Sequence, residues 1–195
     1  MATTKKANNR GRPRRFDPDQ AVATAEPLFH ARGYDAVSVS DITEALGINP
    51  PSFYAAFDSK AGLYARVLDR YARTKAIPLR DLLRADLPVA QSLAEVLEAA
   101  ARLYAAEAAG CLVIEGTRCN DPAAREAARV FHLAAQDRIR RYIAVRHPEE
   151  AERVTDFLTT IMAGLSAQAR EGMSLDRLLA TSSLAATTIA KTLSE

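Results

Sequence analysis

Four helix-start signals follow one another closely between residues 17 and 60, and they constrain the fold more than any other feature of this sequence. A side chain that can cap a helix opens each segment: Asp17, Ser38, Asn49 and Ser59. Proline follows two of these caps, at the first helical position, where its missing N–H is not needed. Gly33 and Gly47 end the first two segments as left-handed caps. The spacing predicts helices over 18–32, 39–46 and 50–57, and a fourth from 60 onward.

The helices expected at 39–46 and 50–57 are about two turns long and are joined by a tight turn at Gly47. Helices this short are not stable alone, so the helices on either side must supply their core. The arrangement is typical of a helix-turn-helix, whose second helix enters the major groove of DNA. An ordinary small helical bundle is the alternative, because short patterns of this kind also arise by chance.

The remaining sequence also predicts helices. Pro78 and Pro88 bracket a break after the fourth helix, and Gly110 and Gly116 flank a short or irregular piece. Long helices are expected at about 90–108, 122–146 and 149–171, with a last one from 175 almost to residue 195. Alanine and leucine dominate, glycine is scarce and strand-like alternation is short-lived, so the chain is predicted to be all-α.

Charge is distributed unevenly along the chain. Residues 1–15 carry six basic side chains and no acidic one, and they lack periodicity, which predicts a flexible basic arm. Residues 1–75 hold 12 basic and 8 acidic side chains, a net charge of +4, whereas residues 76–195 hold 14 and 16, a net charge of −2. This balance favours a first part that meets a polyanion. A merely solubilising tail is the alternative.

Several functional classes are disfavoured. No apolar run approaches the roughly 20 residues that cross a bilayer, and no secretory signal is visible, so we expect a cytoplasmic protein without a membrane partner. The histidines are scattered, and the sequence lacks a metalloprotease motif, a nucleophile elbow and a phosphate loop. We therefore expect no enzyme and no cofactor. Cys111, Glu115 and Cys119 share a face only if residues 111–119 are continuously helical, and a fourth metal ligand is missing.

Two stretches carry a family resemblance. Residues 31–42, ARGYDAVSVSDI, and residues 48–63, INPPSFYAAFDSKAGL, resemble the two halves of the TetR-family DNA-binding signature. The resemblance implies a basic arm at 1–15, an N-terminal three-helix helix-turn-helix DNA-binding domain at 16–62, and a C-terminal helical ligand-binding and dimerisation domain at 63–195. The partners it implies are a double-stranded DNA operator, a second copy of the chain and a small-molecule effector of unknown identity.

Carried onto matching positions, the resemblance implies specific DNA contacts. Ser38, Ser52, Tyr54 and Lys60 would contact the DNA backbone, and the arginines of the arm would reach the minor groove: Arg12, Arg14 and Arg15. The chain departs from the family at Pro50, Pro51, Ala55 and Ala56, none of which donates a side-chain hydrogen bond. Base recognition is then expected from Asn49 or Ser52, with apolar contact to thymine methyl groups from Ala55 or a proline such as Pro50. Tyr54 could instead be a core aromatic with a wet hydroxyl.

The resemblance further implies that the last two helices form a four-helix bundle with those of a second chain, and that an inducer cavity lies in the preceding helices. Candidate pocket residues are Leu103, Tyr104, Cys111, Phe131, Tyr142, Phe157 and Met162. Plain core packing is the alternative for each. Glu115 and Arg118 could be polar anchors of the cavity, with a solvated surface position as the alternative. The expected function is a repressor that a small molecule releases from a palindromic operator. The alternatives are a regulator that senses electrophiles through Cys111, and a dimeric regulator without an effector.

Overall fold

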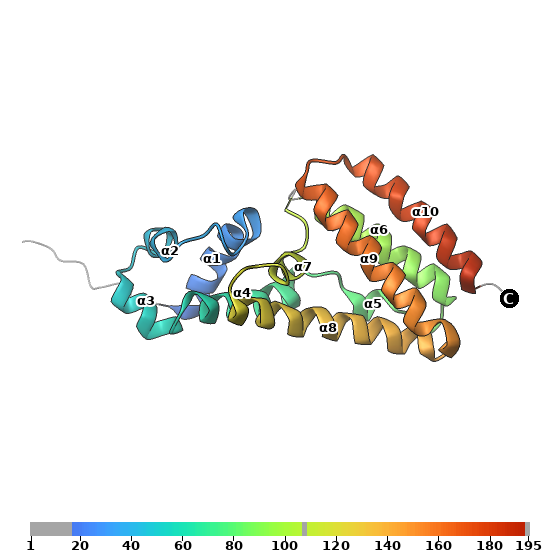
Figure 1. Cartoon of the computed structure of the whole chain (residues 1–195), viewed down its shortest axis with the longest axis horizontal. Coiled ribbons are helices and arrows are strands. Elements are labelled where there is room, and N and C mark those ends of the chain that lie inside the picture. Colours follow the sequence, from blue (N-terminus) through green and yellow to red (C-terminus); the bar gives the residue numbers. More distant parts are fainter. Residues whose placement is uncertain (1–16, 107–108, 194–195) are drawn as a thin grey trace, which may run out of the picture.

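The computed structural model describes residues 17–106 and 109–193, and all elements in these ranges are helices. Four of them form a head at one end of an elongated molecule (Figure 1). The head helices are α1 (Pro18–Arg32), α2 (Val39–Leu46), α3 (Pro50–Phe57) and α4 (Lys60–Thr74). The body follows with α5 (Leu79–Leu82), α6 (Val89–Ala106), α7 (Leu112–Gly116), α8 (Pro122–Ala144), the 3-10 turn η1 (Pro148–Glu150), α9 (Ala151–Arg170) and α10 (Leu175–Leu193). The predicted all-α class is confirmed.

The head helices begin where the sequence predicts. Asp17 accepts hydrogen bonds from the backbone of the first turn of α1, and Ser59 Oγ accepts one from Gly62 N at 3.0 Å at the start of α4. Ser38 and Asp41 form a reciprocal capping box at α2. Gly47 ends that helix at φ 64°, a left-handed conformation that glycine adopts without a side-chain clash. The left-handed residue Gly47 therefore redirects the chain between α2 and α3.

Two short elements are absent from the sequence prediction. The segment between Pro78 and Pro88 was expected to be a plain break, but it contains the one-turn helix α5. No side chain caps α5, and its four residues carry no periodic signal, which explains why the pattern does not predict it. Likewise, the turn η1 precedes α9, so the expected helix from residue 149 begins as an α-helix only at Ala151.

The buried side chains form two clusters, which we call the head core and the body core. Residues of α1, α2 and α3 meet the buried face of α4 in the head core, and Leu112 of α7 and Ala128 of α8 join them. The predicted boundary between residues 62 and 63 therefore runs through the head core, because the face of α4 from Leu63 to Tyr71 belongs to it. In the body core, α6 packs against both α9 and α10.

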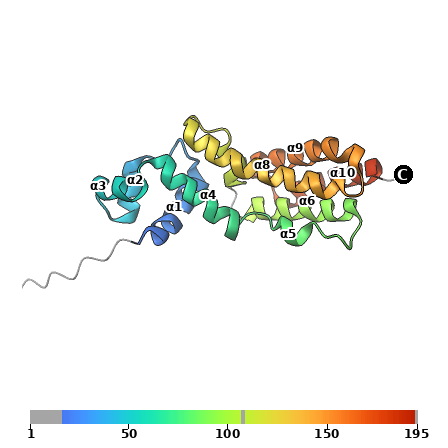
Figure 2. The ribbon, with the colours of Figure 1, turned by 90° about the horizontal axis from the view of Figure 1, so that it is seen from below.

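The long helix α8 connects the two parts. It lies against α4 and α7 near its start and against α9 further along (Figure 2). Gly116 of α7 makes this packing close, because a Cβ atom there would lie 2.5 Å from the Tyr64 hydroxyl and 2.7 Å from Ala128 Cβ. Helix α7 therefore packs closely against α4 and α8 at this position. Among the described helices, none combines the length and apolar content needed to cross a membrane.

Candidate nucleic-acid interface

Helix α3 presents one apolar and one exposed face. Phe53 and Phe57 point into the head core, where their ring centroids lie 5.7 Å apart. The opposite face is exposed and comprises Pro50, Pro51, Ser52, Tyr54 and Ala55. Tyr54 is 50% exposed. Its ring packs edge-on against the Phe53 ring, with 5.2 Å between the two ring centroids. The ring is therefore fixed by the core, while much of the residue faces solvent, as a backbone contact to DNA requires.

Two of the predicted DNA contacts also cap helices. Asn49 Oδ1 accepts a hydrogen bond from Ser52 N at 2.9 Å, so its amide nitrogen is the group left to reach a base. The Ser38 hydroxyl donates to Asp41 Oδ2 at 2.6 Å and accepts from Asp41 N at 3.1 Å. The carboxylate of Asp41 accepts further bonds from Ser38 N and Arg32, and these hydrogen bonds lower its pKa to about 2. Ser38 is thus engaged within the head in this structure.

Lys60 lies in a different environment from that expected for a phosphate contact. Its Nζ donates hydrogen bonds to Tyr34 O at 3.1 Å and Val37 O at 3.0 Å, and it lies 3.9 Å from the centre of the Tyr34 ring. The ammonium group therefore joins the start of α4 to the turn between α1 and α2. The phosphate contact stays a prediction. Arg12, Arg14 and Arg15 lie outside the described residues.

Polar contacts hold the head against the body at two places that the sequence did not suggest. The Tyr34 hydroxyl donates to Asp121 at 2.6 Å, and the Asp35 carboxylate accepts a bond from Asn120 N at 3.0 Å. On the other side, Arg170 at the end of α9 donates to the carbonyl oxygens of His30 and Ala109, at 3.1 and 2.6 Å. These partners lie 61 to 140 residues apart in the chain, so no local pattern connects them.

The seven candidate pocket residues lie in different parts of the structure. Phe131 packs against the head core, whereas Phe157 and Met162 pack against the body core. Tyr104 is buried, and the Tyr142 hydroxyl donates to Arg84 O at 2.6 Å. Of the seven, Leu103 alone lines either of two hollows of about 250 Å³. One hollow is formed by Leu103 with residues of α1 and α4, and the other lies between head and body.

Cys111 bridges the two cores, since its side chain packs against both. Burial raises the pKa of its thiol, although hydrogen bonds to backbone groups and to Tyr71 and Tyr104 oppose that shift. Burial also raises the pKa of the Cys119 thiol, with Asp35 and Asp121 adding to the effect. Both cysteines are free, and both thiols are protonated at neutral pH in this state. The shared helical face considered for Cys111, Glu115 and Cys119 does not form, because α7 ends at Gly116.

Comparison with known proteins places this interface in context. Residues 21–67 match the profile of bacterial regulatory proteins of the tetR family. The chain is 53% identical over 197 residues to the HTH-type transcriptional repressor BdcR of Escherichia coli K12, and the match covers all of both chains. It is 32% identical to the repressor ComR of the same strain, over 88% of each chain.

Solved structures agree with this relationship. A cysteine mutant of the TetR-family regulator CifR, complexed with 26-bp double-stranded operator DNA, shares 31% sequence identity and a TM-score of 0.76. That match covers 90% of this chain and 98% of the CifR chain. The full-length relationship to BdcR, the matched head profile and the shared fold lead to one conclusion. The chain belongs to the TetR family and is a DNA-binding transcriptional regulator, not an enzyme.

Proposed function

We propose that this chain is a homodimeric repressor that binds a palindromic operator and leaves it when a small molecule binds. The observation that carries the DNA-binding part is the exposed face of α3, where Asn49, Ser52 and Tyr54 stand on a helix fixed by its cap and by two buried phenylalanines. The repressor role is supported by BdcR and ComR, both named as repressors. A cytoplasmic location, where bacterial operators lie, belongs to the same proposal.

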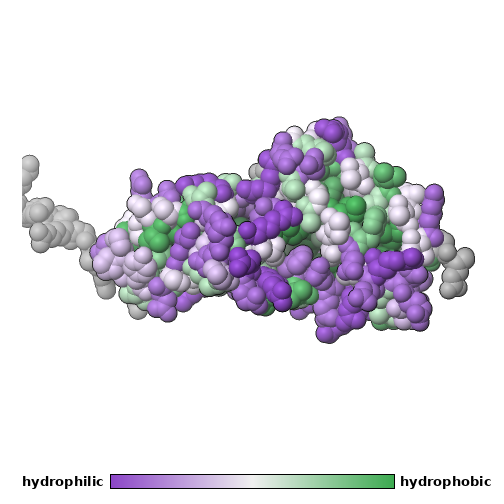
Figure 3. Space-filling model, viewed as in Figure 1, coloured by the Kyte–Doolittle hydropathy of each residue, from purple (hydrophilic) through white to green (hydrophobic). Residues whose placement is uncertain are grey.

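Dimerisation is supported by the outer surface of α9 and α10. Figure 3 shows apolar surface over these helices. Residues 157–169 of α9 and 178–190 of α10 contain no charged side chain. The apolar Leu184 of α10 is nevertheless 71% exposed. A solvent-facing helix normally carries charge, so a surface of this kind indicates a partner. A two-fold dimer would place two α3 helices on the two halves of a palindrome.

The test is fluorescence anisotropy with DNA from the region upstream of the chain's own gene. Wild-type protein is expected to bind one palindrome there, with affinity that falls steeply as salt rises. Tyr54→Phe should weaken binding to all sequences about equally, because it removes a backbone contact. Asn49→Ser keeps a cap at α3 but loses the amide, so it should relax the preference at one base pair by about 1–3 kcal/mol. Binding of every fragment with equal affinity would contradict the proposal.

The structure supports a noncovalent effector better than a thiol sensor. A reactive thiol requires a lowered pKa and access to solvent, whereas burial raises the pKa of Cys111. Cys111→Ser should therefore respond to the effector as wild type does. An alkylating agent that releases DNA from wild type but not from Cys111→Ser would favour the thiol alternative.

A further inference from the structure

The second hollow, which we call the junction hollow, lies between the turn after α1, helix α7 and the end of α9. Its volume is about 250 Å³. The wall combines backbone and aromatic groups with five charged side chains, and it is lined by Arg32, Gly33, Tyr34, Asp35, Ala36, Tyr64, Leu112, Glu115, Arg118, Cys119 and Arg170. The junction hollow lies at the contact between head and body, and none of the seven candidate pocket residues lines it.

Most charged groups around the junction hollow already have partners. Arg32 pairs with Asp41 at 3.2 Å and donates to Ala36 O. Asp35 accepts hydrogen bonds from Asn120 N, and Arg170 donates to the backbone carbonyl oxygens at the end of α1 and at Ala109. These contacts hold the walls of the hollow in place.

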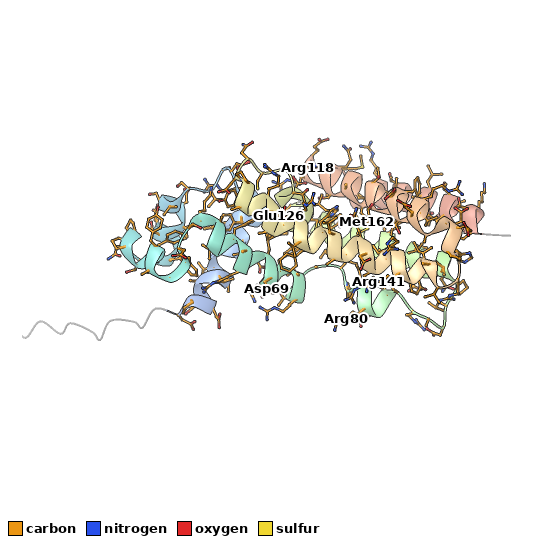
Figure 4. All side chains as sticks on the ribbon, turned by 60° about the horizontal axis from the view of Figure 1, so that its bottom comes forward. Asp69, Arg80, Arg118, Glu126, Arg141 and Met162 are labelled. Atoms are coloured by element: carbon orange, nitrogen blue, oxygen red, sulfur yellow. The ribbon has the colours of Figure 1, made fainter. Side chains whose placement is uncertain are left out.

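Two groups retain unused capacity. Glu115 Oε1 is buried, and no residue in the described ranges donates a hydrogen bond to it, while Glu115 Oε2 lies 4.0 Å from Arg170 Nε. Arg118 pairs, within the same ranges, only with Glu115 Oε1, at 4.0 Å, which is too long for a hydrogen bond. A buried acceptor without a donor is unfavourable and rare in native proteins, so it marks a place where a further group fits. Figure 4 labels Arg118 near the middle of the long axis of the molecule, between the head and the far end of the body.

We propose that the junction hollow binds a small carboxylate with a hydrogen-bond donor on the neighbouring carbon, a 2-hydroxy or 2-amino acid. One carboxylate oxygen would pair with Arg118 and the other would approach Arg170, and the donor would satisfy Glu115 Oε1. This proposal deepens the proposed function, because it names the chemical class of the effector. It rests on that function only for the effect on DNA and not for the binding itself.

The position of the site links binding to the head. Arg170 lines the same hollow, and its guanidinium group holds the carbonyl oxygens of His30 and Ala31 at the end of α1. A bound carboxylate competes with these carbonyl oxygens for Arg170, because a charged acceptor forms the stronger hydrogen bond. The end of α1 would then lose a contact with α9, and the head would be freer to move relative to the body. The ligand should therefore weaken operator binding.

The experiment uses four probes of nearly the same size with the full-length protein, and calorimetry without DNA measures binding. Lactate and alanine carry both groups, propionate lacks the donor, and lactamide lacks the charge. Lactate or alanine is expected to bind with a Kd of about 1 mM or below. Propionate should bind at least about tenfold more weakly, and lactamide should not bind. Arg118→Gln should abolish binding, whereas Arg102→Gln should not, since Arg102 is as exposed (56% against 55%) but pairs with Glu98 on α6.

Glu115→Gln separates the two ligand types. It keeps an acceptor for the hydroxyl group of lactate but removes the charge that an ammonium group requires, so alanine binding should fall and lactate binding should not. The proposal is overturned if no probe binds, if lactamide binds as well as lactate, or if Arg118→Gln binds as wild type does. Because binding is measured without DNA, these failures are distinguishable from a failure of operator binding.

Discussion

The ammonium group of Lys60 can either hydrogen-bond backbone carbonyl groups within the head or contact a DNA phosphate. In this structure its two hydrogen bonds end on the carbonyl oxygens of Tyr34 and Val37, in the turn that leads to the Ser38 cap of α2. Removal of a charged donor from such carbonyl groups destabilises a protein by about 1.5–3 kcal/mol. A group that contacted only phosphate would contribute nothing to the stability of the free protein.

The two roles predict different results for Lys60→Ala. A role in the fold alone predicts that Lys60→Ala lowers the melting temperature and weakens operator binding while the salt dependence of binding stays unchanged, because the head is disturbed and no phosphate contact is lost. The measurement is the slope of log affinity against log salt, with Arg73→Ala as the control, which removes an exposed charge of the same helix. A slope that is smaller by about 1 in Lys60→Ala alone would establish the phosphate contact instead.

The Ser38–Asp41 pair predicts a pH effect on the head. Hydrogen bonds from the Ser38 side chain and backbone are the main reason that the pKa of Asp41 is lowered from 3.8 to about 2. The ionised Asp41 carboxylate therefore contributes its full stabilisation above pH 3.8, and this stabilisation is lost as the pH falls through 2. Ser38→Ala should move this pKa toward 3.8, and the lost cap should destabilise the head by about 1 kcal/mol. A carboxyl-carbon NMR titration measures the pKa. An unchanged value in Ser38→Ala would show that the Ser38 backbone N–H and Arg32, not the Ser38 hydroxyl, cause the shift.

At the scale of the element, Gly62 allows α4 to begin directly against the end of α3. A Cβ atom at this position would overlap the carbonyl oxygen of Phe57. Because α3 has only eight residues, its orientation depends on this contact and on its buried phenylalanines. The backbone also turns sharply here, since Asp58 has φ 65°.

The change in stability caused by Gly62→Ala therefore tests this contact, because the two explanations predict changes of opposite sign. Helix propensity alone predicts a gain in stability of about 1 kcal/mol for this change within α4. The close approach predicts a loss of about 1–3 kcal/mol and weaker operator binding, because α4 must move away from α3. Chemical denaturation and anisotropy measure the two effects. A variant as stable as wild type would show that α4 can move away from the Phe57 carbonyl oxygen without cost.

The helices of the head were predictable because their signals are local. Each cap lies within three residues of the N–H group that it binds, as Ser38, Asn49 and Ser59 show. Helix α5 has no such signal. Glu115 and Arg118 could be considered as polar anchors from the sequence, but the hollow that they line could not be predicted. Its walls come from distant segments, and only the fold brings Arg32 near Arg170. The family resemblance implied an inducer pocket, and two of its aromatic candidates, Phe131 and Phe157, pack against separate cores.

At the scale of the whole molecule, the head is held by the contacts of α8 with α4 and by the polar pairs around Tyr34 and Arg170. No partner covers the outer surface of α9 and α10 in the single chain. The inner face of α10 packs on α6, with Leu178 and Ile189 buried in the body core. Deletion of residues 174–195 would therefore expose the body core as well as remove a dimer surface, and it cannot separate the two roles.

A single exposed residue separates them. Leu184→Glu places a charge on the apolar outer face of α10, where the side chain makes little contact within the chain, being 71% exposed. An unpaired charge is costly to bury between two copies, so we expect this variant to be a monomer with unchanged helix content. Each head then binds one half-site alone, and the operator affinity should fall by at least about 100-fold. Val145→Glu is the matched control, since Val145 is 81% exposed at the end of α8 and should leave the dimer intact. Light scattering gives the mass of each variant. A dimeric Leu184→Glu protein with wild-type affinity would place the contact between copies on another surface.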